Sequence, residues 1–208
     1  EDQMTAKSDE LCPRVESEMI LKPFKVFFEK AFSNDAKKFK ENPALLVNWV
    51  RTNIKLNPDK HAMRIPQTPI STWESRVADE RSRNIFFVDV ARSLGIEAEQ
   101  DGVTGKVQYK KGDQWVDVDF ETTQQQVAKT GKLVLDYKPT EFLDDPKYYT
   151  HFTISKIVNG QTLLMNFDES ADGSTYGATW ANAFKDGATL DEGTYLLVTG
   201  QRMADGSV

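Results

Sequence analysis

The chain has 208 residues, and 26 Lys and Arg against 32 Asp and Glu give a formal net charge of −6. This length allows one large domain or two small ones, and 39% apolar residues with 12 Phe and 4 Trp are too many for a disordered chain. The acidic balance argues against a nucleic-acid partner, because phosphate binding needs a basic patch. The sequence has no apolar run of the roughly 18 residues that a membrane-spanning helix requires.

Cysteine and histidine are scarce. Cys12 is the one cysteine, and His61 and His151 are the two histidines. Internal disulfides, thiol zinc sites and CxxC redox chemistry all need at least two thiols. We therefore predict neither a metal nor a cofactor. Any cysteine-based enzyme would have to use Cys12, which a lone thiol in an N-terminal arm explains more simply.

The first part of the chain predicts an arm followed by helices. Residues 1–22 are charged and weakly patterned, and they lack both an initiating Met and the apolar stretch of a signal peptide. Either an export signal has been removed or the chain is an excised fragment. From Pro23, Phe residues and Ala31 recur at helical spacing, with Pro in the first turn. A second helix is expected from Pro43, capped by Asn42 and ended by Asn57 and Pro58.

Two further helices are expected before residue 95. Thr68 and Pro69 form a helix start signal. The segment Asp79 to Leu94 is apolar around nearly the whole circumference of its second half, which is typical of a buried helix. Asp79 and Glu80 favour the helix dipole at its start, and Gly95 stops it.

After Gly95 the apolar period changes to that of strands. Short segments at 96–100, 106–110 and 114–120 lie between Gly-containing turns and predict an antiparallel meander. Helices followed by a sheet indicate an α+β domain in which the buried helix packs on the sheet.

From about Gly131 the pattern is nearly all β and predicts part of a sandwich. Segments 149–158 and 161–167 flank Asn159-Gly160, the dipeptide best suited to a type I′ hairpin. Phe152 and Ile154 should face one side of it. A further strand is expected at 194–203, and Asp205-Gly206 is another hairpin signal close to the last residue, which suggests a piece of a longer protein.

Two motifs resemble the transglutaminase-like superfamily. The segment 79–96 is similar to the family's buried core helix, which closes in Arg92-x-Leu94-Gly95-Ile96. The segment 112–119 is similar to its strand that carries Trp115 and ends in the catalytic Asp, here Asp119. The resemblance covers about residues 43–122. It implies a papain-like core of a helix on an antiparallel sheet in residues 23–125, followed by a β-rich, sandwich-like module at 130–208.

The family's other catalytic residues are not matched. The resemblance places its nucleophilic Cys on or beside Glu80 and its His near Thr104 and Gly105, so only Asp119 agrees. A carboxylate alone orients no imidazole and activates no thiol. We therefore expect a degenerate site with no catalytic residues. As a hydroxyl needs a positioned base even more than a thiol does, Ser82 is a poor substitute nucleophile.

The helix start nevertheless offers candidate binding residues. Free N–H groups at a helix start can bind a polar ligand. The alternative to a ligand pocket is a network of helix caps and ion pairs that fills the position of the family's catalytic site. An open cleft bounded by Glu80, Thr104 and Asp119 would favour an enzyme or a ligand-binding site. A cleft filled by side chains would favour an architectural role. The candidates are Glu80, Arg81, Ser82, Arg83, Trp115 and Asp119.

Other patterns are less specific. Asp117 and Asp119 are expected on one strand face, where they are either an acid/base pair or, more commonly, the polar side of an amphipathic strand. His151 is placed on a strand between aromatics. An acidic loop at Asp168, Glu169, Asp172 and Gly173 lacks EF-hand spacing. Aromatics that could stack on sugars if exposed are Trp115, Trp180, Tyr148, Tyr149, Tyr176 and Tyr195.

The leading hypothesis is a non-catalytic binding or architectural module of a larger bacterial protein. Its partners would be other domains of the parent polypeptide, a peptide or a glycan. The resemblance alone implies export to the periplasm or cell surface. The alternatives are an acyltransferase or peptidase with a remodelled site, and a carbohydrate-binding module, which predicts a planar exposed row of aromatics on the β part.

Overall fold

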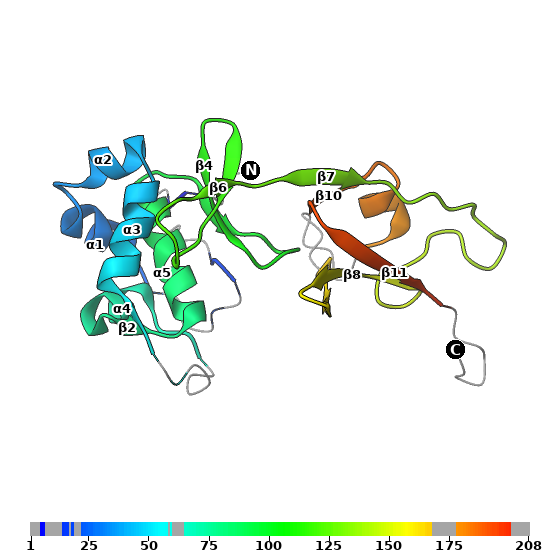
Figure 1. Ribbon diagram of the computed structural model, residues 1–208, viewed down its shortest axis with the longest axis horizontal. Coiled ribbons are helices and arrows are strands. Elements are labelled where there is room, and N and C mark those ends of the chain that lie inside the picture. Colours follow the sequence, from blue (N-terminus) through cyan, green and yellow to red (C-terminus); the bar gives the residue numbers. More distant parts are fainter. Residues whose placement is uncertain are drawn as a thin grey trace. The chain divides into compact units, whose positions relative to one another are not determined.

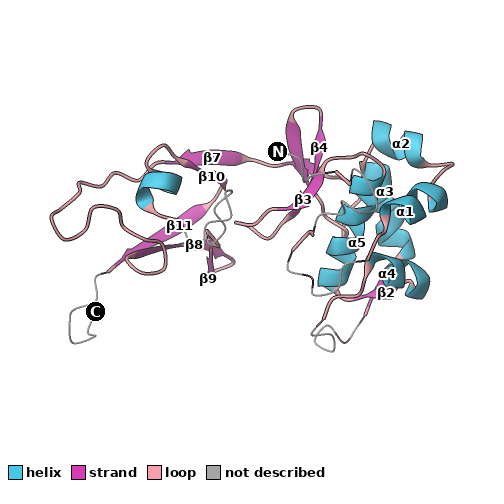
Figure 2. Ribbon diagram, turned by 180° about the vertical axis from the view of Figure 1, so that it is seen from behind, coloured by secondary structure: helices cyan, strands magenta, loops and turns pink. Residues whose placement is uncertain are grey.

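The chain is an α+β protein that divides into two compact units. The computed structural model describes residues 5–6, 14–16, 18, 22–57, 59, 65–167 and 178–200. Unit 1 comprises Glu1–Asp101 and Gly105–Ala128, and unit 2 comprises Gly102–Thr104 and Lys129–Val208. Within the described residues, the α-helices belong to unit 1, and unit 2 has strands and one π-helix (Figures 1 and 2).

The predicted helices of unit 1 are present, with one addition. The helices are α1 (Lys25–Ala31), α2 (Ala36–Glu41), α3 (Ala44–Asn53), α4 (Pro69–Ser75) and α5 (Glu80–Ser93). The short α2, which the sequence pattern did not predict, buries a single aromatic, Phe39. Thr68 caps α4 and Asp79 caps α5, as their start signals indicated.

The expected ends of α3 were wrong. Its N-cap residue is Pro43 and no side chain caps it, so Asn42 does not have the predicted role. The helix stops at Asn53, before Asn57, because the chain turns into strand β1 (Lys55–Leu56). This strand pairs in parallel with β2 (Val77–Ala78).

Helix α5 is the centre of the unit 1 core, as its all-round apolar sequence predicted. Phe86 is fully buried, and its ring lies 5.6 Å from that of Phe28 on α1 and 6.4 Å from that of Trp49 on α3, measured between centroids. Trp49 in turn stacks on Trp73 of α4 at 5.4 Å. The helices before α5 therefore close one side of it with aromatic rings.

The other side of α5 packs on the predicted meander. Its strands are β3 (Ala98–Gln100), β4 (Val107–Lys111), β5 (Gln114–Asp117) and a short addition, β6 (Gln126–Val127), in the antiparallel order β3-β4-β5-β6. Tyr109 and Val116 are paired across β4 and β5, and both are buried. The ring of Tyr109 lies 6.4 Å from that of Phe87 on α5. One sheet face is thus the second wall of the core.

Described residues of the N-terminal arm contact the end of α5. The amide N–H of Ala6 donates to the carbonyl of Arg92 at 3.2 Å. The Arg92 guanidinium donates to the carbonyls of Ala98 at 2.8 Å and Arg14 at 3.2 Å. Arg92 is buried and lies near the equally buried Asp89. These residues of the arm are therefore joined to α5 by contacts with Arg92.

The described residues of unit 2 form two small sheets. One pairs β7 (Thr130–Leu133) with β10 (Ala188–Asp191), and the other has the antiparallel order β11-β8-β9, with β8 (Phe152–Val158), β9 (Gln161–Leu164) and β11 (Thr194–Thr199). The hairpin prediction is confirmed, since Asn159 (φ 52°) and Gly160 (φ 78°) both have the positive φ of a type I′ turn. Strand β8 begins at Phe152, three residues later than expected. Tyr149 has a φ of 64° and lies in the preceding turn.

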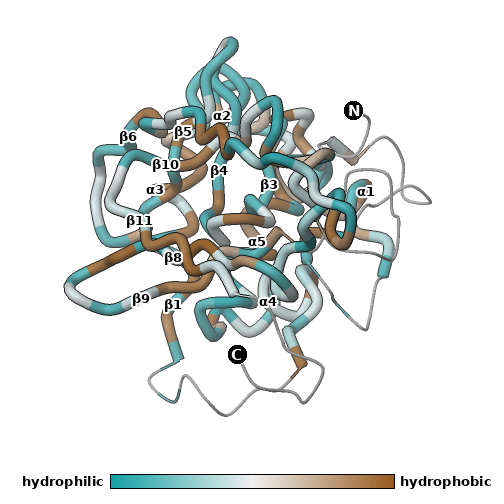
Figure 3. The backbone as a smooth tube through the Cα atoms, turned by 90° about the vertical axis from the view of Figure 1, so that its right-hand side faces the viewer, coloured by the Kyte–Doolittle hydropathy of each residue, from teal (hydrophilic) through white to brown (hydrophobic). Residues whose placement is uncertain are grey.

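The core of unit 2 draws on both sheets and on the π-helix η1 (Trp180–Phe184). Phe184 is fully buried, and its ring lies 5.2 Å from that of Phe152 and 4.8 Å from that of Phe167. Tyr148 also belongs to this core, because it is buried, and its hydroxyl donates to the Met165 carbonyl at 2.8 Å. The hydropathy view shows apolar stretches along β8, β9 and β11 (Figure 3).

Neither a membrane-spanning helix nor a metal-binding cluster is found among the described residues. In that part of the chain no helix has both the length and the apolar character needed to cross a bilayer. No three His, Cys, Asp or Glu residues there are grouped so that they could hold a metal ion.

Candidate functional site

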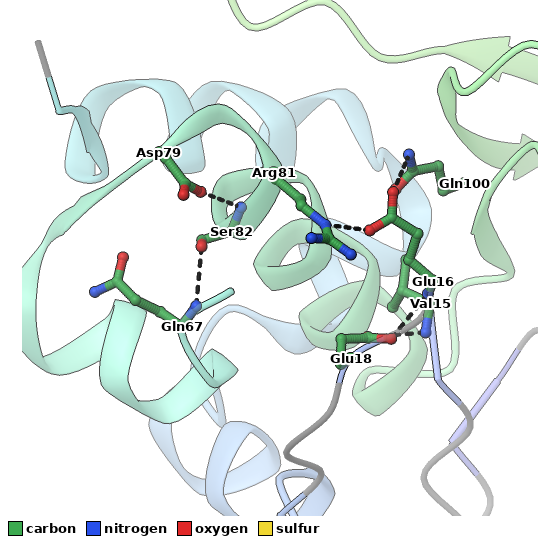
Figure 4. Close-up of polar contacts among 8 residues, drawn as sticks. All are labelled: Val15, Glu16, Glu18, Gln67, Asp79, Arg81, Ser82 and Gln100. Atoms are coloured by element: carbon green, nitrogen blue, oxygen red, sulfur yellow. Dashed lines mark hydrogen bonds and ion pairs between the residues drawn. The ribbon is translucent and has the colours of Figure 1, made fainter. Parts of the chain in front are cut away.

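The helix-start residues of the resemblance form a bonded cluster at the beginning of α5. Asp79 accepts a hydrogen bond from the Ser82 amide at 2.6 Å, which is the N-cap interaction of α5. The Ser82 hydroxyl accepts the amide N–H of Gln67 at 3.0 Å, and Ser82 has no exposed surface. Figure 4 shows both contacts side by side. The Ser82 oxygen is therefore used to fix the segment before α4.

Arg81 points to the N-terminal arm. Its guanidinium Nε forms an ion pair with a carboxylate oxygen of Glu16, and the other Glu16 oxygen accepts from the side-chain amide of Gln100 at 3.3 Å (Figure 4). Arg81 thus contributes to a link between the arm, the start of α5 and β3. The sequence pattern did not single out Glu16 as a partner, because 65 residues separate it from Arg81.

Arg83 is buried beside several carboxylates. Its guanidinium lies 4.5 Å from the ring centroid of Phe120 and 3.6 Å from the Glu121 carboxylate. Burial lowers the pKa of Arg83, and the charges of Glu121, Glu80 and Asp119 oppose that shift. Glu80 and Asp119, two of the three positions that the resemblance assigned to the catalytic residues, therefore both act on the charge of Arg83. The Nε atom of Arg83 has no hydrogen-bond partner among the described residues.

Asp117 and Asp119 have separate hydrogen-bond partners. Asp117 accepts hydrogen bonds from Lys106 at 2.8 Å and from the Gln108 side chain at 2.6 Å. Asp119 lies beyond the end of β5 and accepts the Glu121 amide at 2.7 Å in a tight turn. Each carboxylate has its own local partners, which favours the commoner of the two interpretations, polar residues at the edge of the sheet. The expectation that both lie on one strand was wrong, because β5 ends at Asp117.

Trp115 and Thr104 are not part of the cluster on α5. Trp115 neighbours Val116 on β5, and because successive strand residues face opposite sides, it lies on the sheet face away from the core that Val116 enters. Thr104 lies in a turn that groups with unit 2. Cys12, His61 and the acidic loop at 168–173 lie outside the described residues.

The carboxyl groups whose pKa is raised lie elsewhere, at Asp89 on α5 and Glu99 on β3. Burial raises the pKa of Asp89 well above the ordinary range; Arg92 opposes that shift and Glu18 adds to it. Burial also raises the pKa of Glu99. Oδ1 of Asp89 lacks a hydrogen-bond partner in the described chain. None of these groups belongs to the helix-start cluster.

The second candidate site is a groove in unit 2, which we call the unit 2 groove. It has a volume of about 610 Å³ and lies between the segment that follows β7, η1 and the end of β11. The Trp180 indole N–H donates to the Leu135 carbonyl at 2.8 Å, and the Tyr137 hydroxyl donates to the Leu143 carbonyl at 2.9 Å. Its main lining residues are Leu135, Tyr137, Phe142, Leu143, Trp180 and Leu197.

Three of the aromatics considered for sugar stacking, Trp180, Tyr148 and Tyr195, have hydrogen bonds within unit 2, and Tyr176 lies outside the described residues. Tyr137 and Trp180 meet at 65°, so their faces are not coplanar. Tyr148 is buried, and the Tyr195 hydroxyl donates to the Asp191 carbonyl at 2.7 Å. His151, expected on a strand, lies in a turn, and its Nδ1 accepts the Lys147 amide at 2.9 Å.

Sequence reasoning missed most of the groove. The wall from Leu135 to Pro146 has neither helical nor strand period, and it therefore gives no signal of regular structure. The sequence signal that could have indicated this wall is the presence of large apolar residues in a segment without regular structure. These residues are Leu135, Phe142 and Leu143, and the segment also contains Pro139 and Pro146. Such residues in a loop need a partner surface, which here is unit 2 itself.

Comparisons with known proteins give little further assignment. No family model matches the chain, and no curated protein matches it. A search of solved structures found "a Putative Cysteine Protease from Cytophaga hutchinsonii", with 11% identity, a TM-score of 0.33 and coverage of 85% of this chain and 48% of that chain. The chain thus spans about half the length of that protein. The likeness is distant, and the transglutaminase-like resemblance remains a prediction from the sequence.

Proposed function

We propose that the chain is a non-catalytic binding and architectural module of a larger, exported bacterial protein. The observation that supports this most directly is Ser82. Its hydroxyl stands near the start of α5, where the resemblance expects a nucleophile, but it is fully buried and accepts a backbone hydrogen bond from Gln67. A nucleophile must reach its substrate and have a base within hydrogen-bond distance.

The charged groups around Ser82 support the same proposal. Asp79 caps α5, Arg81 pairs with Glu16, and Asp119 holds a turn. These contacts support an architectural role for Asp79, Arg81 and Asp119. The unit 2 groove supports the binding part of the proposal, since concave apolar surfaces of about 300–1,000 Å³ are typical ligand sites.

An acyl-transfer assay tests the proposal. The purified chain is incubated with a glutamine-containing protein and a fluorescent primary amine, and separately with a quenched peptide substrate. We expect neither amine incorporation nor cleavage above the buffer control. Ser82→Ala and Cys12→Ala variants are run in parallel. Activity that is lost in either variant would overturn the non-catalytic assignment and identify the nucleophile.

The exported location rests on the resemblance and needs its own test. An antibody against the chain is used on fractionated cells of the producing bacterium. We expect the signal in the periplasmic or surface fraction. A signal confined to the fraction of cytosolic marker enzymes would contradict the location and leave the non-catalytic assignment standing.

A further inference from the structure

The unit 2 groove lies over one face of the β11-β8-β9 sheet. Phe152 on β8 is paired with Thr199 on β11, and Leu197 stands two residues before Thr199. Residues that are directly opposite in a pair, or two apart on a strand, have their side chains on the same face. Phe152, Leu197 and Thr199 all line the groove. The floor of the groove is therefore this sheet face, and its walls come from the segment after β7 and from η1.

Four aromatic side chains line the groove, and two of them form a corner. The four are Tyr137, Phe142, Phe152 and Trp180. The rings of Tyr137 and Trp180 meet at 65°, with their centroids 5.6 Å apart. We call this pair the aromatic corner. Its polar tips are bonded to backbone carbonyls, so a ligand meets the rings and not their donors. A corner of this kind suits a compact, rounded group better than the flat face of a sugar ring.

The charge of the groove is negative. Asp136 is the one formally charged side chain among the described lining residues, and its carboxylate has no hydrogen-bond or ion-pair partner in the described chain. His151 adds no positive charge, because its Nδ1 accepts the Lys147 amide and is therefore unprotonated. The Lys185 ammonium lies 5.6 Å from the centre of the Trp180 ring but does not line the groove. An anion is therefore disfavoured there and a cation is favoured.

Aromatic rings with a single carboxylate select the kind of cation. The face of an aromatic ring attracts a cation that lies within about 6 Å of its centroid. A primary ammonium or a guanidinium also needs several hydrogen-bond acceptors, whereas a quaternary ammonium has no N–H and spreads its charge over methyl groups. The carbonyls of Leu135 and Leu143 already accept from the aromatic corner. The volume of about 610 Å³ is typical of a small-molecule site, so it leaves space for an apolar body beside the cationic head.

We infer that the unit 2 groove binds a small quaternary ammonium compound with an apolar body. Its cationic head lies against the aromatic corner and Phe142, Asp136 supplies the opposite charge, and its body lies on the sheet face of Phe152 and Leu197. The inference rests on the proposed binding role and names the class of ligand. Its failure is distinguishable from that of the proposed function, because an empty groove would leave the non-catalytic assignment standing, and acyl-transfer activity would not alter the groove.

Titration of the full chain with matched probes tests the inference. The probes are choline, its uncharged isostere in which a tert-butyl group replaces the trimethylammonium group, and benzyltrimethylammonium, which adds an aromatic body. Binding is followed by the indole N–H signal of Trp180 in proton–nitrogen correlation spectra, with the three tryptophans of unit 1 as internal references. We expect choline to bind about twofold to thirtyfold more tightly than its isostere. Benzyltrimethylammonium should bind more tightly than choline, because its ring buries further apolar surface.

Two pairs of variants locate the ligand. Phe142→Leu removes a ring and keeps apolar contact, whereas Phe142→Tyr keeps the ring; this residue is 89% exposed, so neither change should alter stability. Asp136→Asn removes the charge of the groove, and its control is Glu141→Gln, an exposed carboxylate of the same segment that does not line the groove.

The first member of each pair should weaken binding of benzyltrimethylammonium by about twofold or more, and the second should leave it unchanged. The inference is overturned if neither cation shifts the Trp180 signal at millimolar concentration, or if choline and its isostere bind equally. It is also overturned if Phe142→Leu or Asp136→Asn weakens binding no more than its control does.

Discussion

Replacing Asp79 with alanine separates a structural from a functional role of the helix-start cluster. The Asp79 carboxylate accepts the Ser82 amide at 2.6 Å, and both residues are buried. Loss of an N-cap costs about 1 kcal/mol and up to about 2. Loss of a negative charge at a helix start adds about 0.3–1 kcal/mol. We expect the free energy of unfolding to fall by about 2 kcal/mol, because the buried amide is also left without an acceptor.

A matched variant calibrates that magnitude. Thr68→Ala removes the N-cap of α4, whose bond to the Ser71 amide is longer, at 3.3 Å, and exposed. It should cost about 0.5–1 kcal/mol. Both variants are compared with the parent by urea denaturation, followed by far-ultraviolet circular dichroism at the helix band, which reports mainly on unit 1 because the described α-helices lie there.

A small change in the free energy of unfolding of Asp79→Ala would refute the structural role of the cluster. Polar groups kept for binding or catalysis often cost stability, and their removal is then neutral or stabilising. If Asp79→Ala changes the free energy of unfolding by less than about 0.5 kcal/mol while Thr68→Ala shows its expected loss, the cluster is not a stabilising network. The proposal that these contacts replaced an active site would then fail.

Three further substitutions test the core, the turn and the buried charge. Phe86→Ala should cost about 3–5 kcal/mol in a urea titration, because the fully buried ring leaves a cavity. Gly160→Ala should lower the stability of unit 2 by about 1–2 kcal/mol through backbone strain at φ 78°, whereas Gly102→Ala, with open space and no positive φ, should not change it. Burial raises the pKa of Asp89, so the folded state binds that proton more tightly than the unfolded state does. The resulting stability is present below the unfolded pKa and is lost as pH rises through the folded pKa. The melting temperature of Asp89→Asn should therefore exceed that of the parent at alkaline pH, and the difference should become smaller toward acidic pH. A difference in melting temperature that does not change with pH would contradict the raised pKa.

Local signals predicted most of unit 1. The all-round apolar helix α5, the caps Thr68 and Asp79, and the Gly-punctuated meander each depend on a few neighbouring residues, and each is present. The end of α3 was misplaced because it depends on pairing between β1 and β2, whose residues are 22 positions apart. Pairing of that kind leaves no trace in the periodicity of either segment.

The contacts of the candidate residues could not be predicted in the same way. The sequence drew attention to the residues around the start of α5, but two of their partners, Glu16 and Gln67, are distant in sequence. The unit 2 groove was missed because the segment 135–146 has no regular period. Local sequence patterns predict which helix or strand carries a residue. The residues that it contacts depend on tertiary structure, which brings together segments that are distant in sequence.

The contacts of the N-terminal arm with α5 have a consequence for the order of folding. Arg14 and Arg92 are separated by 78 residues, and Arg92 also needs the carbonyl of Ala98. During synthesis from the N-terminus, the arm leaves the ribosome long before its partners exist, and closing so large a loop carries an entropic cost. The arm can therefore dock only after α5 and β3 have been translated, so Arg14 waits for a partner that is made 78 residues later.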